Sequence, residues 1–373
     1  MASGLHVVTP WCNSYAARHS LTTRGSSVMT YTTIGKQIAA FSFALGLSAC
    51  LDGGGGSGST GSDAGSDQNG GSNAGAASFT NRITRVDYDY DNNGVVDATD
   101  DIAYDADGRV NLTSYFYNDD GTADLLNLRD DSVTQETNAF TYDSDGNVTL
   151  FVVDRQFQRI EASVTYDSAG LFARQDFQFL NGSGGQISAT YWAFAYTGQQ
   201  LDQVDSFFGS NTTPTTTQSF SYDASGLPVA SRITGGSLDA TSTFSWRPDG
   251  QLDSIDTQSD NGDSSSGVME YDAQGLQQTQ TWTNSGQGFN YSEITGRNYI
   301  RSVTYDGQNR PQVVSYDMDA DGSVDATVTF TWETASCIPA TLWAPNAFPN
   351  FVRDTTRPFV PGAGFFTTQF CAP

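Results

Sequence analysis

The chain has 373 residues and is strongly acidic, with 17 basic and 42 acidic residues. All 42 acidic residues but only 14 of the basic ones follow Cys50, so the chain from Cys50 onward has a formal charge of −28, with no histidine and no lysine. This composition excludes Ser-His-Asp and Cys-His catalysis, His-ligated zinc or haem, and Schiff-base chemistry. It also argues against nucleic acid as a partner, because phosphate binding needs clustered cations.

The first 49 residues contain no acidic side chain and lead into a short apolar run, QIAAFSFALGLSAC, at residues 37–50. This run is too short to span a bilayer and has the form of a signal-peptide core. We therefore expect residues 1–28 to be upstream sequence from a misplaced start, and residues 29–49 to be the signal peptide.

The apolar run ends in Leu47-Ser48-Ala49-Cys50, which resembles the lipobox of bacterial lipoproteins. The resemblance implies lipidation of Cys50, for example with palmitate, and attachment to a membrane through that lipid. Leu51, rather than aspartate, in the next position implies the outer membrane of the cell envelope, with either leaflet open. The alternative is an ordinary secretory signal followed by a chance cysteine.

Residues 50–79 form the expected tether, because residues 51–78 consist almost entirely of Gly, Ser, Ala, Asp and Asn. Such a segment cannot bury apolar area and stays a flexible coil. Its mean end-to-end distance is roughly 30 Å. The folded domain is therefore predicted to begin near residue 80.

A short motif repeats through the folded part, as in TYDSDGNV at Tyr142 and SWRPDGQL at Trp246. The residues before each turn alternate between apolar and Thr or Ser, as half-buried antiparallel strands do. The aspartate is expected to cap the turn and the glycine to supply a positive φ. The anchors of the repeat, predicted to share one inner face, are Tyr104, Tyr142, Tyr166, Tyr222, Trp246, Tyr271 and Tyr305, with a degenerate copy at Tyr196.

This unit resembles the YD-repeat, or RHS, family over roughly residues 83–332. Large RHS proteins enclose a toxin and end in a DPxGL-like run, which this chain lacks, so toxin encapsulation is not carried over. We predict an all-β domain over residues 80–335, in which tandem hairpins form one long curled or spiral sheet. An aromatic platform for sugars is the alternative interpretation of the anchors.

The C-terminal residues 336–373 are rich in Pro and Phe and lack strand alternation. They are predicted to form an irregular cap over the last open edge, or a plug in the curl. If Cys50 is lipidated, Cys337 and Cys371 remain as a pair and are expected to form a disulfide in an oxidising envelope compartment.

Two acidic stretches have the spacing of an EF-type calcium loop, with oxygen ligands at alternate positions and glycine at the bend. The first offers Asp89, Asp91, Asn93, the Val95 carbonyl, Asp97 and Asp100; the second offers Asp317, Asp319, Asp321, the Ser323 carbonyl and Asp325. A weaker third copy offers Asn118, Asp120 and Asp124. The flanking sequences read as strands, so bound calcium would be structural, and the alternative is that these loops are simple turns.

Together these features predict a lipid-anchored outer-membrane protein with a structural or adhesive β-repeat domain braced by calcium. We expect a glycan or a protein as its partner, and no catalysis. One alternative is a carbohydrate-binding module. The other is a glycoside hydrolase with a carboxylate pair, although nothing in the sequence selects two of its 37 aspartates.

Overall fold

The computed structural model describes residues 79–117, 135–156, 158–198, 200–235, 239–285 and 298–337, and the backbone of three short C-terminal strands. All of them belong to one compact unit, Ala39–Pro373. Their secondary structure is β-strand: β1 (Phe79–Asp89), β2 (Ala98–Tyr104), β3 (Val110–Tyr117), β4 (Gln135–Tyr142), β5 (Val148–Arg155), β6 (Gln158–Tyr166), β7 (Phe172–Asn181), β8 (Gln186–Thr197), β9 (Gln200–Phe208), β10 (Thr216–Tyr222), β11 (Pro228–Thr234), β12 (Ala240–Trp246), β13 (Leu252–Ser259), β14 (Ser264–Tyr271), β15 (Gln277–Ser285), β16 (Tyr299–Tyr305), β17 (Pro311–Asp317), β18 (Ala326–Cys337), β19 (Ala340–Leu342), β20 (Phe366–Thr368) and β21 (Cys371–Ala372). No helix in this part of the chain is long and apolar enough to cross a membrane.

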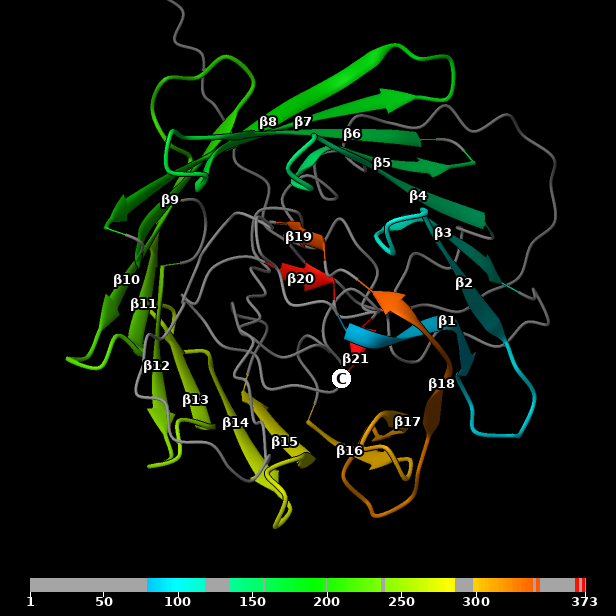
Figure 1. The fold of residues 1–373 in the computed structure, drawn as a ribbon. Coiled ribbons are helices and arrows are strands. Elements are labelled where there is room, and N and C mark those ends of the chain that lie inside the picture. The colour runs from blue at the N-terminus through cyan, green and yellow to red at the C-terminus, as the bar shows by residue number, and fades with distance from the viewer. Residues whose placement is uncertain are drawn as a thin grey trace, which may run out of the picture. The chain divides into compact units, whose positions relative to one another are not determined.

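Strands β1 to β18 form a closed antiparallel barrel in chain order (Figure 1). Each strand pairs with the next, and β1 pairs with β18 through registers such as Val86 opposite Phe330 and Tyr88 opposite Val328. The expected curled or spiral sheet is therefore wrong. Pairing of the first strand with the last leaves the ring without free edges, which removes a site of aggregation.

One face of each strand is buried and the other is exposed, as the sequence alternation predicts. In β12, Ala240, Ser242 and Phe244 are buried while Thr243 and Ser245 are exposed. The buried face carries the apolar side chains, and successive buried positions continue from strand to strand as a single hydrophobic cluster. This burial is the main force that holds the hairpins in register.

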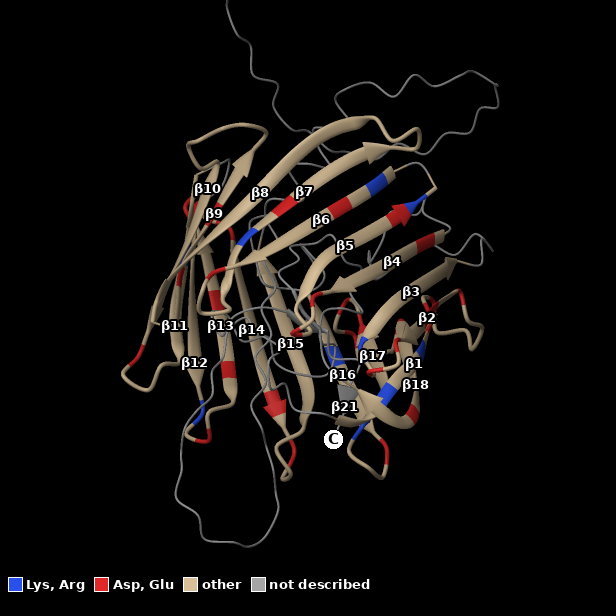
Figure 2. Cartoon of the chain, turned by 45° about the horizontal axis from the view of Figure 1, so that its top comes forward, with Lys and Arg blue, Asp and Glu red and all other residues tan. Residues whose placement is uncertain are grey.

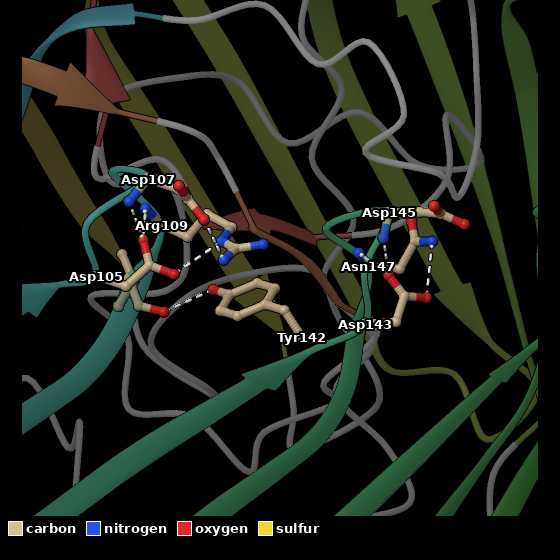
Figure 3. Close-up of polar contacts among 8 residues, drawn as sticks. Asp105, Asp107, Arg109, Tyr142, Asp143, Asp145 and Asn147 are labelled. Carbon is tan, nitrogen blue, oxygen red and sulfur yellow. Dashed lines mark hydrogen bonds and ion pairs between the residues drawn. The ribbon is translucent and has the colours of Figure 1, made fainter.

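The turns of the repeat are built around the predicted aspartate and glycine (Figure 3). In the β4–β5 turn, Asp143 Oδ1 accepts hydrogen bonds from the backbone N–H groups of Asp145 and Asn147, and Gly146 has a φ of 87°. Burial works to raise the pKa of Asp143, but the hydrogen bonds, first from Asn147, lower it below its ordinary value. The β2–β3 turn repeats this geometry around Asp105.

The anchor aromatics link each hairpin to its neighbour. Each is half-buried against the core, and its hydroxyl or indole N–H donates to a backbone carbonyl of an earlier strand; Figure 3 shows this contact for Tyr142. The pairs are Tyr104 with Ile83, Tyr142 with Val110, Tyr166 with Val148, Tyr222 with Leu201, Trp246 with Pro228, Tyr271 with Leu252 and Tyr305 with Gln277, at 2.6 to 2.9 Å. Trp332 in β18, which is not one of the predicted anchors, donates to the Pro311 carbonyl in the same way. These contacts join the turns into one rim of the barrel.

Because the pKa values of the anchor tyrosines are raised, we expect the barrel to unfold cooperatively in alkali. Burial raises the pKa of Tyr142, Tyr166 and Tyr271 above the ordinary value for tyrosine, so the folded state keeps protons that the unfolded state loses near pH ~10. Their contribution to stability is complete below that pH and is lost as the pH rises above it. Tyrosinate absorbance and circular dichroism should therefore change together in one steep transition. A gradual absorbance change near pH ~10 with unchanged dichroism would contradict the prediction.

The C-terminal region departs from the predicted irregular cap where the structure describes it. β19 and β20 form a separate two-stranded sheet, and β21 pairs with β1. Residues 343–365 lie outside the described part of the chain. The expected role of covering an open edge is wrong, because β1 and β18 already pair with each other.

The two cysteines predicted to form a disulfide lie in strands that both pair with β1. Cys337 ends β18 opposite Phe79, and Cys371 in β21 lies opposite Arg82. Cys337 is fully buried, whereas the side chain of Cys371 lies outside the described residues. We expect mass spectrometry without reduction to recover one peptide pair that contains both cysteines. Recovery of both as alkylated thiols would rule out the pairing.

Candidate metal site at the barrel seam

The first acidic loop connects β1 to β2 and gathers three of its predicted carboxylates. Oxygens of Asp89, Asp91 and Asp97 lie within 4.8 Å of one another. Asp89 also accepts hydrogen bonds from the backbone N–H groups of Asn93 and Gly94, at 3.1 and 2.8 Å. Gly94, at the bend, has a φ of 86°. The loop thus concentrates negative charge on a tight turn, as a site for a hard cation requires.

The second acidic loop, between β17 and β18, repeats this geometry. Oxygens of Asp317, Asp319 and Asp325 lie within 4.8 Å of one another, and Asp317 accepts hydrogen bonds from the N–H groups of Asp321 and Gly322, at 3.1 and 2.8 Å. Corresponding positions of the two loops therefore fold alike, although they lie at opposite ends of the barrel sequence.

The closure of the barrel makes the two loops neighbours. Because β1 pairs with β18, the β1–β2 and β17–β18 connections lie on the same rim at the seam. The Asn92 side-chain amide donates a 2.9 Å hydrogen bond to the Val324 carbonyl and joins the loops directly. We call these two connections the seam loops. The flanking elements are strands, as the sequence predicts.

The remaining predicted ligands have other partners or positions. Asp100 is buried in β2 and accepts a 2.8 Å hydrogen bond from the Tyr88 hydroxyl, outside the three-carboxylate group. Asn93 Oδ1 and Asp321 Oδ1 accept bonds from the backbone N–H groups of Val95 and Ser323. The third copy, at Asn118, Asp120 and Asp124, lies outside the described residues.

The donor set of each seam loop fits a hard divalent cation. Three carboxylates, with the side-chain oxygen of Asn93 or Asp321 and the carbonyl of Val95 or Ser323 close by in sequence, supply the oxygen ligands that calcium prefers. Each group lacks the bidentate acid that closes a high-affinity loop. The arrangement suits a weakly held structural ion.

The structure also brings together a half-buried aromatic pair that the repeat pattern did not reveal. Tyr191 in β8 and Phe207 in β9 stack face to face, and the Arg174 guanidinium of β7 lies over the Tyr191 ring. The repeat anchors mark only the buried aromatic phase of each strand. Tyr191 and Trp192 are adjacent, so one of them had to face the other way, which is the signal that could have revealed the group.

Comparisons with known proteins give only distant structural similarities. No protein-family model matches the sequence, and no curated protein does. A porin-like protein from Bacteroides uniformis is 11% identical with a TM-score of 0.36, covering 68% of this chain and 96% of its own. One from Bacteroides vulgatus is 9% identical with a TM-score of 0.23, covering 67% and 98%. The Photorhabdus luminescens Tc holotoxin pore is 13% identical with a TM-score of 0.24, covering 61% of this chain and 14% of its own. Scores this low assign neither a family nor a function.

Proposed function

We propose that the protein is a lipoprotein of the cell envelope whose YD/RHS-like β-barrel is held in water beyond the outer membrane by the Cys50 lipid and its tether. Its proposed role is structural or adhesive, without catalysis. The observation that carries this proposal is the polarity of the exposed face of the barrel.

Over the described strands, the exposed face has no apolar band of the kind that lipid requires. Its strands present charged side chains at exposed positions, including Arg85, Asp101, Arg174, Asp256 and Glu270, and Figure 2 shows charged positions along the strands as well as at the turns. In the described part of the chain the exposed large hydrophobic residues are Val95, Leu112, Phe116, Ile187, Phe208, Val268 and Val324. An arginine facing lipid at mid-membrane costs about 2–4 kcal/mol, so this face supports a barrel that stands in water.

The strand order places the start of β1 and the end of β18 on the same rim, where the tether would attach. The chain enters the barrel at the start of β1 and leaves it at the end of β18, on the rim formed by the repeat turns. The tether therefore joins this rim, and the seam loops lie on the opposite one. We include calcium binding by the seam loops in the proposal, because ions there would fix two adjacent hairpins at one end of the pairing between the first and last strands.

Replacing the lipidated cysteine tests the anchor. We expect Cys50→Ala to abolish incorporation of radiolabelled palmitate and to move the protein from the membrane fraction to the soluble fraction, because no other lipidation site is proposed. Ser57→Ala, in the tether that follows the cysteine, is the matched control and should behave as wild type. Retention of palmitate label by Cys50→Ala, or membrane sedimentation that survives the substitution, would refute the lipoprotein proposal.

A further inference from the structure

An asparagine–glycine pair lies at the bend of the first seam loop. Asn93 and Gly94 are both exposed, and Gly94 has a φ of 86°. In such a pair the backbone nitrogen of the glycine can attack the side-chain amide carbon of the asparagine, because glycine has no Cβ to crowd the approach. The attack closes a succinimide ring and releases ammonia. How readily it happens depends on the contacts that the fold gives to these atoms.

The attacking nitrogen is held by a carboxylate. The Gly94 N–H donates a 2.8 Å hydrogen bond to Asp89 Oδ2. A backbone nitrogen becomes a nucleophile only as it gives up its proton, and a carboxylate at hydrogen-bond distance can accept that proton while the new bond forms. The loop therefore supplies a base in contact with the nucleophile.

The side-chain amide under attack is oriented as well. Asn93 Oδ1 accepts a 2.7 Å hydrogen bond from the Val95 N–H, and Asn93 Nδ2 donates a 2.9 Å bond to Asp91 Oδ2. Negative charge develops on Oδ1 as the nitrogen attacks, so the Val95 N–H stabilises the tetrahedral intermediate. Because both reacting groups are fixed before they meet, less entropy is lost in reaching the transition state.

The asparagine–glycine pair of the β13–β14 turn has only part of this arrangement. Asn261 Oδ1 accepts a 2.9 Å hydrogen bond from the Asp263 N–H, so its amide is held in the same way. The Gly262 N–H, however, donates to the Ser259 carbonyl at 3.0 Å, and a backbone carbonyl is far too weak a base to take the proton. Asn261 is therefore an internal reference for the same chemistry without the base.

The second seam loop already carries aspartate at the corresponding position. Asp321 Oδ1 accepts a 2.8 Å hydrogen bond from the Ser323 N–H, and the Gly322 N–H donates a 2.8 Å bond to Asp317 Oδ2. These contacts match those of Asn93 and Gly94 in the first loop. Conversion of Asn93 to aspartate would thus give the first loop a residue that the same backbone geometry already accommodates in the second.

We propose that Asn93 is a self-modification site, which the first seam loop converts to aspartate or isoaspartate. The Gly94 nitrogen bonds to Asn93 Cγ and its proton passes to Asp89; the Cγ–Nδ2 bond then breaks, and ammonia leaves with that proton. Water adds to either carbonyl of the ring and opens it, so that its oxygen enters the new carboxylate. The modification does not depend on calcium, whereas any gain in calcium affinity from the aspartate product rests on the proposed function of the seam loops.

Peptide mass spectrometry of the purified protein tests this site. The protein is kept in EDTA and in water enriched in heavy oxygen, and is then cleaved in ordinary water with trypsin, which releases residues 86–109. We expect Asn93 to take up solvent oxygen about tenfold faster than Asn261, because general-base assistance contributes at least this much. Asp89→Asn should slow Asn93 to a rate close to that of Asn261 and leave Asn261 unchanged.

The matched control is Asp317→Asn, which removes the corresponding carboxylate from the second loop and should leave the Asn93 rate unchanged. Circular dichroism confirms that each variant folds; if Asp89→Asn does not, Asp89→Glu, which displaces the carboxylate from Gly94, takes its place and should also slow the reaction. In guanidinium chloride the two asparagines should react at similar rates, because both precede glycine. Three results would overturn the proposal: Asn93 reacts no faster than Asn261 in the folded protein, loss or displacement of the Asp89 carboxylate leaves its rate unchanged, or its advantage persists in the unfolded chain.

Discussion

Trp282→Ala is expected to lower the free energy of unfolding by about 3–5 kcal/mol, and Gly267→Ala by about 1–3 kcal/mol. The Trp282 indole is fully buried and packs on Gly267, its cross-strand partner. A Cβ added at Gly267 would lie 2.7 to 2.8 Å from three carbons of that indole. The first change leaves a cavity and the second overpacks the same contact. Denaturant unfolding monitored by circular dichroism measures both effects.

The two substitutions should also be coupled. In Gly267→Ala with Trp282→Ala, the smaller side chain makes room for the new methyl group, so the double variant should lose less stability than the sum of the two single variants. Gly307→Ala is the matched control, because a Cβ there meets no atom within 4 Å, and it should change stability little. Simple additivity in the double variant would show that the indole does not pack on Gly267.

Removal of calcium is expected to lower the melting temperature of the barrel. Sites of this kind have dissociation constants of about 10⁻⁴ to 10⁻³ M, so calcium at about 10 mM would stabilise the fold by about 1.4–2.7 kcal/mol per occupied seam loop. Each kcal/mol corresponds to roughly 2–4 °C for a domain of this size. Calorimetry in EDTA and then in excess calcium measures the shift, which should be reversible.

Substitutions in the seam loops test whether the shift in melting temperature comes from calcium binding at these loops or from general screening of the acidic charge. Asp89→Asn together with Asp317→Asn removes one carboxylate from each group and should abolish most of the calcium response. Asp145→Asn, an exposed aspartate in a repeat turn, is the control and should keep it. If sodium chloride at matched ionic strength gives the same shift as calcium, or if the double variant still responds, the seam loops are turns and not ion sites.

The geometry of the repeat turns could be predicted from the sequence, because it depends on residues close together in the chain. Tyr142, Asp143 and Gly146 lie within a few residues of one another, and turn chemistry depends on just such neighbours. The backbone bonds to Asp143 and the positive φ of Gly146 follow the prediction. Period-two alternation likewise identified the buried face of strands such as β12. The repeat anchors did not point to the contact between Tyr191 and Phe207, because these two rings lie on the face opposite to the buried one.

The sequence by itself determined the hairpin unit, the buried face of its strands and the acidic composition of the seam loops, because each of these depends on residues close together in the chain. Only the tertiary structure decided that the sheet closes. The pairing of Val86 with Phe330 joins residues from the two ends of the barrel, and no local periodicity encodes such a contact. That single long-range pairing removes the open edges and brings Asn92 to Val324, so two candidate sites distant in sequence become neighbours.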